Sequence, residues 1–163
     1  MEQEKKVSTR TLHGAGDKFH GIMALYVILC AAINWGVIGD LTIPFLEANF
    51  ARGIGLALLV VGAVFLKLSM GQIKSAFKKK VLITDGLFAL TRNPAEGTWI
   101  FFIVPGLALL SYRLIMLTAI PFQAWLFIYL IPEEEAVLEK EFGQAYVEYK
   151  KSVPRLIPKA PSY

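Results

Sequence analysis

Four long apolar runs constrain what this chain can fold into. They cover residues 21–39, 53–70, 94–111 and 113–131. Each run is close to the ~20 residues that a helix needs to cross the hydrocarbon core of a bilayer. Hydrophobic residues make up 55% of the 163 residues, which is too apolar for an ordinary soluble domain. The sequence therefore predicts an all-α integral membrane protein with about four transmembrane helices, in a single domain over residues 1–163.

The segments outside the runs complete this prediction. Residues 1–20 are expected to form a cytoplasmic tail, and residues 132–163 a cytoplasmic helix and tail. The turn Ser111-Tyr112-Arg113 is very short, so the third and fourth runs are predicted to form an antiparallel helical hairpin. Pro105 and Pro121 lie inside these two runs and predict helix kinks.

The basic residues predict the orientation in the membrane. Of the 17 lysines and arginines, 14 lie before the first run, between the second and third, or after the fourth. Only Arg52 and Arg113 fall in the two opposite loops, and Lys67 lies near the end of the second run. By the positive-inside rule both termini are cytoplasmic, and we expect the plasma (inner) membrane of a prokaryote. This asymmetry accounts for the net charge of +4, so no nucleic-acid partner is predicted.

Neither the histidines nor the cysteine indicates a metal site. His13 and His20 are seven residues apart and lack acidic or cysteine neighbours. Cys30 lies in the middle of the first run, where a small buried apolar residue is expected. No metal is therefore predicted.

The start of the third run has two features. Asn93-Pro94-Ala95-Glu96 resembles a capping box, with asparagine at the N-cap, proline at the first helical position and glutamate at the third. Arg92 stands directly before this start, at the membrane surface. A helix N-terminus attracts anions, and an arginine beside it can add a bidentate contact to a carboxylate or phosphate.

The last 32 residues predict an amphipathic helix that starts at Pro132. Its apolar stripe, at helical spacing, consists of Leu138, Phe142, Ala145, Tyr146, Tyr149 and Val153. Glu134 lies on this stripe, Glu135 flanks it, and Glu133 is explained by the helix dipole. A carboxylate that faces the bundle needs a cation. Arg92 is one candidate, and the ammonium or sulfonium group of a ligand is another.

Gly143 falls inside this predicted helix, where glycine costs ~1 kcal/mol relative to alanine. Its presence predicts the close approach of a ligand or a backbone segment.

The ordered polar residues of the second half resemble a known family. These residues are Gly86, Arg92, Asn93 and Pro94, then Glu134, Glu135, Leu138, Phe142, Gly143, Tyr146, Tyr149, Arg155 and Pro158. Their spacing across a helical hairpin resembles the membrane methyltransferases that include isoprenylcysteine carboxyl methyltransferases and phospholipid N-methyltransferases. The resemblance covers roughly residues 71–158. Two positions depart from it, since Glu96 stands where a tyrosine is usual and Thr98 where a glycine is usual.

The resemblance implies transfer of a methyl group from S-adenosylmethionine to a lipophilic acceptor at the cytoplasmic membrane face. The acceptor would be a prenylcysteine-like carboxylate, a phospholipid amine or another small hydrophobic molecule. The implied cofactor-binding residues are Gly86, Leu87, Arg92, Asn93, Pro94, Glu96, Gly97, Glu134, Glu135, Phe142 and Gly143.

The resemblance also implies catalytic roles for Glu135, Arg155 and Tyr146. A carboxylate acceptor needs no base, whereas an amine or thiol must lose a proton to Glu135, Glu96 or Tyr146. Arg155 would hold an anionic acceptor group.

Two other classes of function stay open from the sequence. One is a non-catalytic or transport-type small membrane protein, although charges that cluster on the cytoplasmic side count against transport. The other is a lipid reductase on a related helical scaffold, but the chain has no dinucleotide-binding fingerprint.

Overall fold

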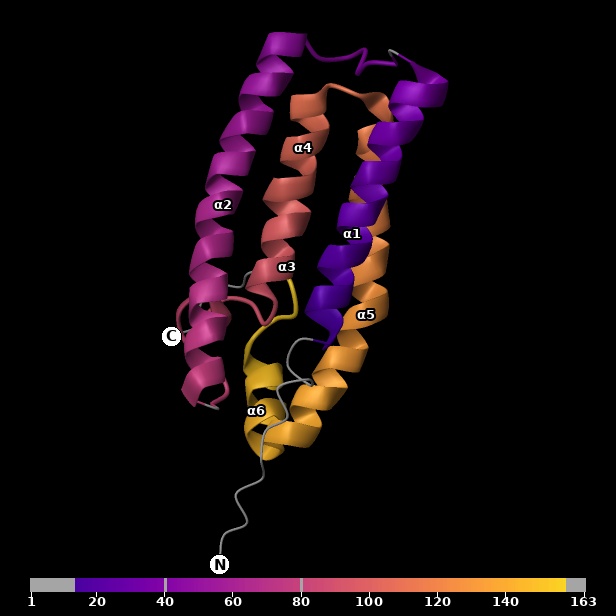
Figure 1. Ribbon diagram of the computed structural model, residues 1–163. Coiled ribbons are helices and arrows are strands. Elements are labelled where there is room, and N and C mark those ends of the chain that lie inside the picture. The colour runs from indigo at the N-terminus through magenta and orange to yellow at the C-terminus, as the bar shows by residue number, and fades with distance from the viewer. Residues whose placement is uncertain (1–13, 40, 80, 158–163) are drawn as a thin grey trace, which may run out of the picture.

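A computed structural model describes residues 14–157 except 40 and 80. Its helices run side by side in an elongated bundle, with the short helix α6 (Gln144–Ser152) at one end (Figure 1). Within these residues, four helical segments are long and apolar enough to cross a membrane: Lys18–Val37, Ala48–Ala76, Pro94–Ser111 and Leu114–Phe142. The predicted class, an all-α integral membrane protein, is confirmed.

The first two spans are longer than their apolar runs. Helix α1 covers Gly14–Ile33 and continues into the π-helical turn Asn34–Ile38, and helix α2 covers Ala48–Lys79. The 32 residues of α2 extend over about 48 Å at 1.5 Å per residue, more than the ~30 Å of a hydrocarbon core. Apolar runs mark only the part of a helix in contact with lipid, so the polar helix ends were missed.

The predicted hairpin of the third and fourth spans is confirmed. The third span consists of α3 (Pro94–Thr98), the π-helical turn Trp99–Ile103 and α4 (Val104–Ser111). Tyr112 then reverses the chain with a φ of 57°, and its hydroxyl donates a hydrogen bond to the Leu46 carbonyl at 2.5 Å. A 3₁₀ turn, Leu114–Thr118, leads into helix α5 (Ala119–Phe142).

A π-helical turn, in place of a simple kink, precedes Pro105 in the third span. Proline lacks the N–H that would close a regular helical hydrogen bond to the residue four positions earlier. The turn Trp99–Ile103 ends just before this proline, and the Ile100 carbonyl accepts a hydrogen bond from Gln123 Nε2 at 3.2 Å. Gln123 is fully buried, which explains why an amide side chain lies within the fourth apolar run.

The prediction of one C-terminal helix that starts at Pro132 is wrong. Pro132 lies inside α5, which continues to Phe142, and the chain then breaks at Gly143 before α6. Gly143 has a φ of 58°, a left-handed conformation that favours glycine. Among the described residues, a side-chain carbon at this position would meet nothing within 4 Å, so the expected close approach of a backbone segment is wrong, and the left-handed φ accounts for the glycine.

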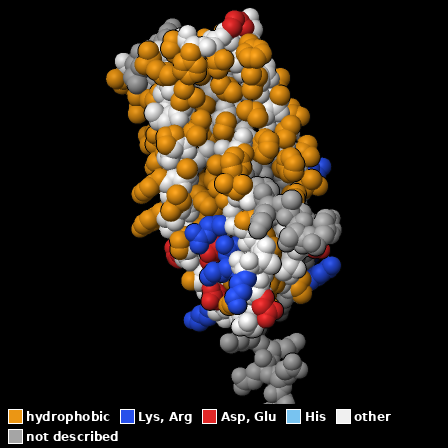
Figure 2. All heavy atoms as spheres, turned by 180° about the vertical axis from the view of Figure 1, so that it is seen from behind, with side chains coloured by type: hydrophobic (Ala, Val, Ile, Leu, Met, Phe, Trp, Pro, Cys, Tyr) orange, Lys and Arg blue, Asp and Glu red, His pale blue; other side chains and the backbone are white. Residues whose placement is uncertain are grey.

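The bundle is held together by two sets of helix contacts. Helices α2 and α4 pack closely where Gly55 and Gly106 face each other, and Gly62 of α2 lies against Phe102 and Ile103 of the π-helical turn. Helices α1 and α5 pack through buried apolar side chains that include Phe19, Met23, Phe127 and Ile131. Apolar side chains also cover the outside of the bundle, and charged groups gather at one end (Figure 2).

Candidate functional site

A pocket lies at the α6 end of the bundle, where the charged side chains gather. Its walls come from the end of α2, residues 81–83, the 3₁₀ turn Gly86–Ala89, the start of α3, the end of α5, and α6. The lining residues are Ile73, Ala76, Val81, Leu82, Ile83, Phe88, Arg92, Asn93, Glu96, Glu134, Glu135, Leu138, Phe142, Tyr146 and Tyr149.

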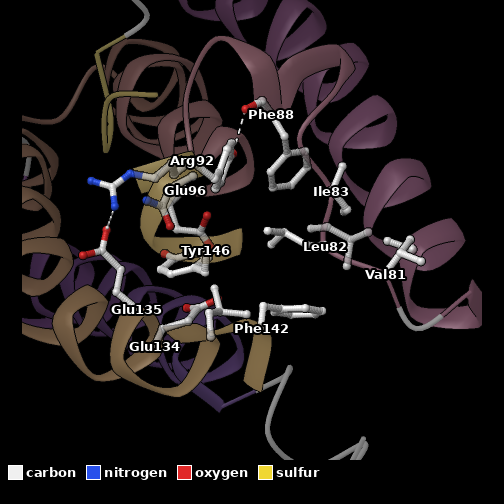
Figure 3. Close-up of a pocket in the computed structure, with 15 residues that line it drawn as sticks. Val81, Leu82, Ile83, Phe88, Arg92, Glu96, Glu134, Glu135, Phe142 and Tyr146 are labelled. Atoms are coloured by element: carbon white, nitrogen blue, oxygen red, sulfur yellow. Dashed lines mark hydrogen bonds and ion pairs between the residues drawn. The ribbon is translucent and has the colours of Figure 1, made fainter. Parts of the chain in front are cut away.

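The pocket has a charged half and an apolar half (Figure 3). Arg92, Glu96, Glu134 and Glu135 gather on one side of it, around Tyr146. The opposite wall is formed mainly by Val81, Leu82, Ile83 and Phe88. A ligand with a charged end and a flat apolar end matches this division.

Glu135 is the centre of the charged half. Its carboxylate lies 2.9 Å from Arg92 Nη1, and it accepts hydrogen bonds from Arg155 Nε at 3.1 Å and from Arg155 Nη2 at 2.6 Å. The side chains of Arg92 and Glu135 are only 9% and 5% exposed. Two guanidinium groups therefore hold one buried carboxylate, in an arrangement that fixes all three side chains.

The sequence predicts that Glu134 faces the bundle and that Glu135 flanks the apolar stripe. The prediction for Glu135 is wrong. Glu135 is 4% exposed, whereas Glu134 is half-buried and also lines the pocket. The physical reason is that α5 runs through Pro132 without a break. Glu135 therefore continues the buried face of Phe127 and Ile131, each one helical turn before the next.

Hydrogen bonds attach the C-terminal segment to the start of α3. The Arg155 carbonyl accepts hydrogen bonds from Thr91 Oγ1 at 3.1 Å and from Asn93 Nδ2 at 2.8 Å. The Arg92 backbone N–H donates to the Pro154 carbonyl at 2.9 Å. These bonds place Arg155 beside Glu135, across 20 residues of sequence.

The predicted capping box is wrong in its side-chain bonds. Asn93 does stand at the N-cap position, but its side chain makes no capping hydrogen bond. Its amide group binds the Arg155 carbonyl instead, and its own N–H donates to Thr91 Oγ1 at 3.4 Å. Asn93 thus connects two segments of the site. Its backbone N–H, which the glutamate of a capping box would bind, is already bonded to Thr91 Oγ1.

Two buried tyrosines from α6, Tyr146 and Tyr149, line the pocket. Tyr149 donates a hydrogen bond from its hydroxyl to the Phe88 carbonyl at 2.7 Å. Burial, aided by the Glu135 charge, raises the pKa of Tyr146 to about 12, and burial also raises the pKa of Tyr149. The Tyr146 phenol therefore stays protonated at neutral pH and is suited to donate a hydrogen bond.

Gly86 and Leu87 shape a turn beside the pocket and do not line it. The Leu87 N–H donates to Gln72 Oε1 at 3.2 Å, and Gln72 Nε2 donates to the Asp85 carbonyl at 3.3 Å. Gly86 has a φ of 57°, and a side-chain carbon there would collide with the Gln72 amide. Pro94, Gly97 and Gly143 also lie outside the lining.

The structure therefore brings together most of the predicted site residues and adds others. Arg92, Asn93, Glu96, Glu134, Glu135, Phe142 and Tyr146 line the pocket, and Arg155 reaches it through Glu135. The apolar wall was missed, although the short run Val81-Leu82-Ile83 directly after the lysines was a visible signal. Pro158 and His13 lie outside the described residues.

No protein-family model matches the chain. It is 31% identical over 115 residues to the protein-S-isoprenylcysteine O-methyltransferase of Xenopus laevis, a match that covers 64% of this chain and 40% of the relative. It is 27% identical over 125 residues to the protein of the same name from Tribolium castaneum, with 69% and 43% covered. The chain thus spans less than half the length of these curated relatives.

A solved structure of the eukaryotic intramembrane Ras methyltransferase ICMT, an isoprenylcysteine carboxyl methyltransferase, has a similar fold. The TM-score is 0.64 at 24% sequence identity, and the match covers 96% of this chain and 58% of the other. The chain is therefore an integral membrane protein with the fold of a membrane methyltransferase. Its particular resemblance is to the isoprenylcysteine carboxyl methyltransferases, as the motifs predicted.

Proposed function

We propose that this protein transfers a methyl group from S-adenosylmethionine to a lipophilic acceptor at the membrane surface. The observation that carries the proposal is the pocket itself. It joins the motif residues Arg92, Glu134, Glu135 and Tyr146 to an apolar wall in one cavity. The similarity to the two curated methyltransferases and to the ICMT fold supports the same activity.

The residues of the pocket fit S-adenosylmethionine. Arg92 Nε is buried and has no hydrogen-bond partner among the described residues, so the guanidinium keeps a donor for the methionine carboxylate after pairing with Glu135. The Glu134 carboxylate is suited to the methionine ammonium. The apolar wall around Phe88 and Leu82 offers a surface for the adenine ring. When bound, S-adenosylmethionine supplies a methyl group on a positively charged sulfur.

The other residues of the site would position and enclose the ligand. Glu135 holds Arg92 and Arg155 in fixed orientations, and the hydrogen bonds of Thr91 and Asn93 hold the C-terminal segment against the start of α3. Methyl transfer depends on alignment of the two reactants, and side chains held in fixed orientations serve this need.

The charge distribution supports an orientation with the pocket at the cytoplasmic face. Lys74, Lys78 and Lys79 on α2 and Lys150 and Lys151 on α6 lie at the pocket end of the bundle. Under the positive-inside rule this end faces the cytoplasm, and we propose that a lipophilic acceptor reaches the pocket laterally from the inner leaflet. The plasma membrane of a prokaryote remains our proposal for the location.

The proposal is tested by titration of S-adenosylmethionine and S-adenosylhomocysteine into the purified protein. We expect both to bind, and we expect Glu134→Gln and Arg92→Ala each to weaken binding at least tenfold. Glu133→Gln is the matched control, because the Glu133 side chain is 61% exposed and pairs with Lys18 at the surface. Folding of each variant is checked by circular dichroism. A folded wild type that binds neither compound would refute the proposed function.

A further inference from the structure

Three lysines form a basic stripe near the pocket end of α2. Lys67, Lys74 and Lys78 are spaced by seven and four residues, so they lie on one side of the helix. All three are exposed, and none of them pairs with a carboxylate among the described residues. Gly71 lies between Lys67 and Lys74 on the same side, where a side-chain carbon would meet nothing within 4 Å. The stripe therefore has an open space between two positive charges.

The same side of α2 is apolar beyond the basic stripe. Leu56, Val60 and Val64 continue it toward the other end of the helix at helical spacing, with exposed fractions of 56%, 58% and 54%. Helix α2 lies at the edge of the bundle, on the side away from α1 and α5 (Figure 1). In a membrane, this side of α2 therefore offers an apolar surface to lipid chains and positive charges at one end of that surface.

The basic stripe lies at the depth of the lipid headgroups. Arg52 marks the opposite membrane surface, with its guanidinium over the ring of Tyr112 at 5.8 Å from the centroid. At 1.5 Å per residue, Lys67 is about 22 Å and Lys74 about 33 Å from Arg52 along α2. A hydrocarbon core of ~30 Å that begins near Arg52 therefore ends between Lys67 and Lys74.

Extension of the side chain toward water does not account for Lys67. Lysines near the end of a span usually direct their charge to the nearer aqueous side. In an α-helix, however, the Cα–Cβ bond tilts toward the N-terminus, and the N-terminus of α2 is the end far from the pocket. The Lys67 side chain thus leaves the helix toward the membrane interior. Lys74 and Lys78 add like charges beside it, and an anion at the headgroup level would neutralise all three.

We propose that the basic stripe binds an anionic phospholipid of the adjacent leaflet. The phosphate lies over Gly71, between Lys67 and Lys74, and the acyl chains lie along Val64 and Val60. The attraction of a lysine to anionic lipid at a membrane surface supplies the affinity, and the apolar side of α2 supplies the contact for the chains. No group of the donor pocket takes part, so this binding does not depend on the proposed function.

The bound lipid would also act on the pocket through the opposite side of α2. Ile73 and Ala76 line the pocket, and the Gln72 side chain binds the backbone of Asp85 and Leu87 in the turn beside it. A lipid that fixes the depth of this end of α2 fixes this wall of the pocket as well. We therefore expect the lipid to tighten binding of the methyl donor.

The site is tested by lipid titration in a neutral detergent, with bound lipid counted by native mass spectrometry. The full-length protein is titrated with phosphatidylglycerol, with phosphatidylcholine of the same chains, or with glycerol 3-phosphate. We expect phosphatidylglycerol to bind at least about tenfold more tightly than phosphatidylcholine, and glycerol 3-phosphate not to bind. In Lys67→Gln/Lys74→Gln the affinity for phosphatidylglycerol should fall about 30-fold, since each lysine contributes a factor of about five. Equal affinity for the two lipids, or binding of glycerol 3-phosphate as tight as that of phosphatidylglycerol, would overturn the proposal.

Two further variants distinguish a defined site from positive charge alone. Lys79→Gln/Lys151→Gln removes two exposed charges at the pocket end, but Lys79 lies off the basic stripe and Lys151 lies on α6. It should keep its affinity for phosphatidylglycerol within about threefold of the wild type. Gly71→Leu keeps every charge and fills the space for the phosphate, so we expect a loss of at least about tenfold. Equal losses in the two double variants, or wild-type affinity in Gly71→Leu, would contradict the site.

Donor titration tests the link to the pocket, and this part rests on the proposed function. S-Adenosylmethionine is titrated into the protein in nanodiscs of phosphatidylglycerol or of phosphatidylcholine. We expect binding at least about threefold tighter in phosphatidylglycerol for the wild type, and equal binding in the two lipids for Lys67→Gln/Lys74→Gln. Equal donor affinity of the wild type in both lipids would overturn the link. A wild type that binds the lipid but not the donor would refute the proposed function and leave the lipid site standing.

Discussion

Replacement of Glu135 by alanine is expected to abolish methyl transfer and to lower the free energy of unfolding by about 3–5 kcal/mol, the usual effect of breaking a buried ion pair from one side. The reason is that Arg92, with a side chain only 9% exposed, would keep its charge without a partner. Arg155 would lose both of its hydrogen bonds to the carboxylate. Denaturation in mixed detergent micelles, followed by circular dichroism, measures the change in stability.

Two further variants make the Glu135 result interpretable. Glu133→Ala removes an exposed carboxylate two residues away and should change stability by less than about 1 kcal/mol. Glu135→Gln keeps the shape of the side chain and should fold even if the alanine variant does not. If Glu135→Gln were as stable and as active as the wild type, the ion pairs would have no role in holding the site.

Alanine at Gly55 or Gly106 is expected to destabilise the bundle by about 1–3 kcal/mol, the range for an overpacked core. A side-chain carbon on Gly55 would lie 2.6 Å from the Leu110 nitrogen and 2.8 Å from the Gly106 carbonyl oxygen. On Gly106 it would lie 3.0 Å from the Gly55 carbonyl oxygen. Backbone atoms of a packed helix cannot move aside as a flexible side chain can, so α2 and α4 would have to separate.

Gly53 and Gly71 are the matched controls for Gly55, since all three glycines lie in α2. A side-chain carbon at either position would meet nothing within 4 Å. Alanine there should leave stability unchanged or raise it by up to about 1 kcal/mol, because alanine favours helix more than glycine does. The same denaturation measurement applies. A loss of stability at Gly53 equal to that at Gly55 would contradict the close packing of α2 on α4.

The membrane spans could be predicted from the sequence because the bilayer imposes a simple rule. Lipid requires about 20 apolar residues per helix, and the four runs obey it. The polar ends of α2 and the continuation of α5 past Pro132 do not follow from that rule. A proline can lie in a helix when neighbouring groups tolerate the lost hydrogen bond, and this depends on the surroundings of the helix.

The charged half of the site could be predicted because ionisable residues near a bilayer are rare and functional. The ion pairs within this charged half could not be predicted from the sequence. Which of Glu134 and Glu135 faces inward depends on the phase of α5, and that phase depends on whether the helix restarts at Pro132. The bonds from Thr91 and Asn93 to the Arg155 carbonyl join segments more than 60 residues apart, and local pattern gives no sign of them.

Transfer of a labelled methyl group from S-adenosylmethionine into lipid is the most direct test of the central claim. The purified protein, reconstituted in vesicles made from a total membrane lipid extract, would be incubated with the labelled donor, and the organic phase would be counted. We predict label in the lipid fraction for the wild type and for Glu133→Gln, and background counts for Glu135→Gln. Background counts for a folded wild type that binds the donor would contradict the claim that this pocket methylates a lipophilic acceptor.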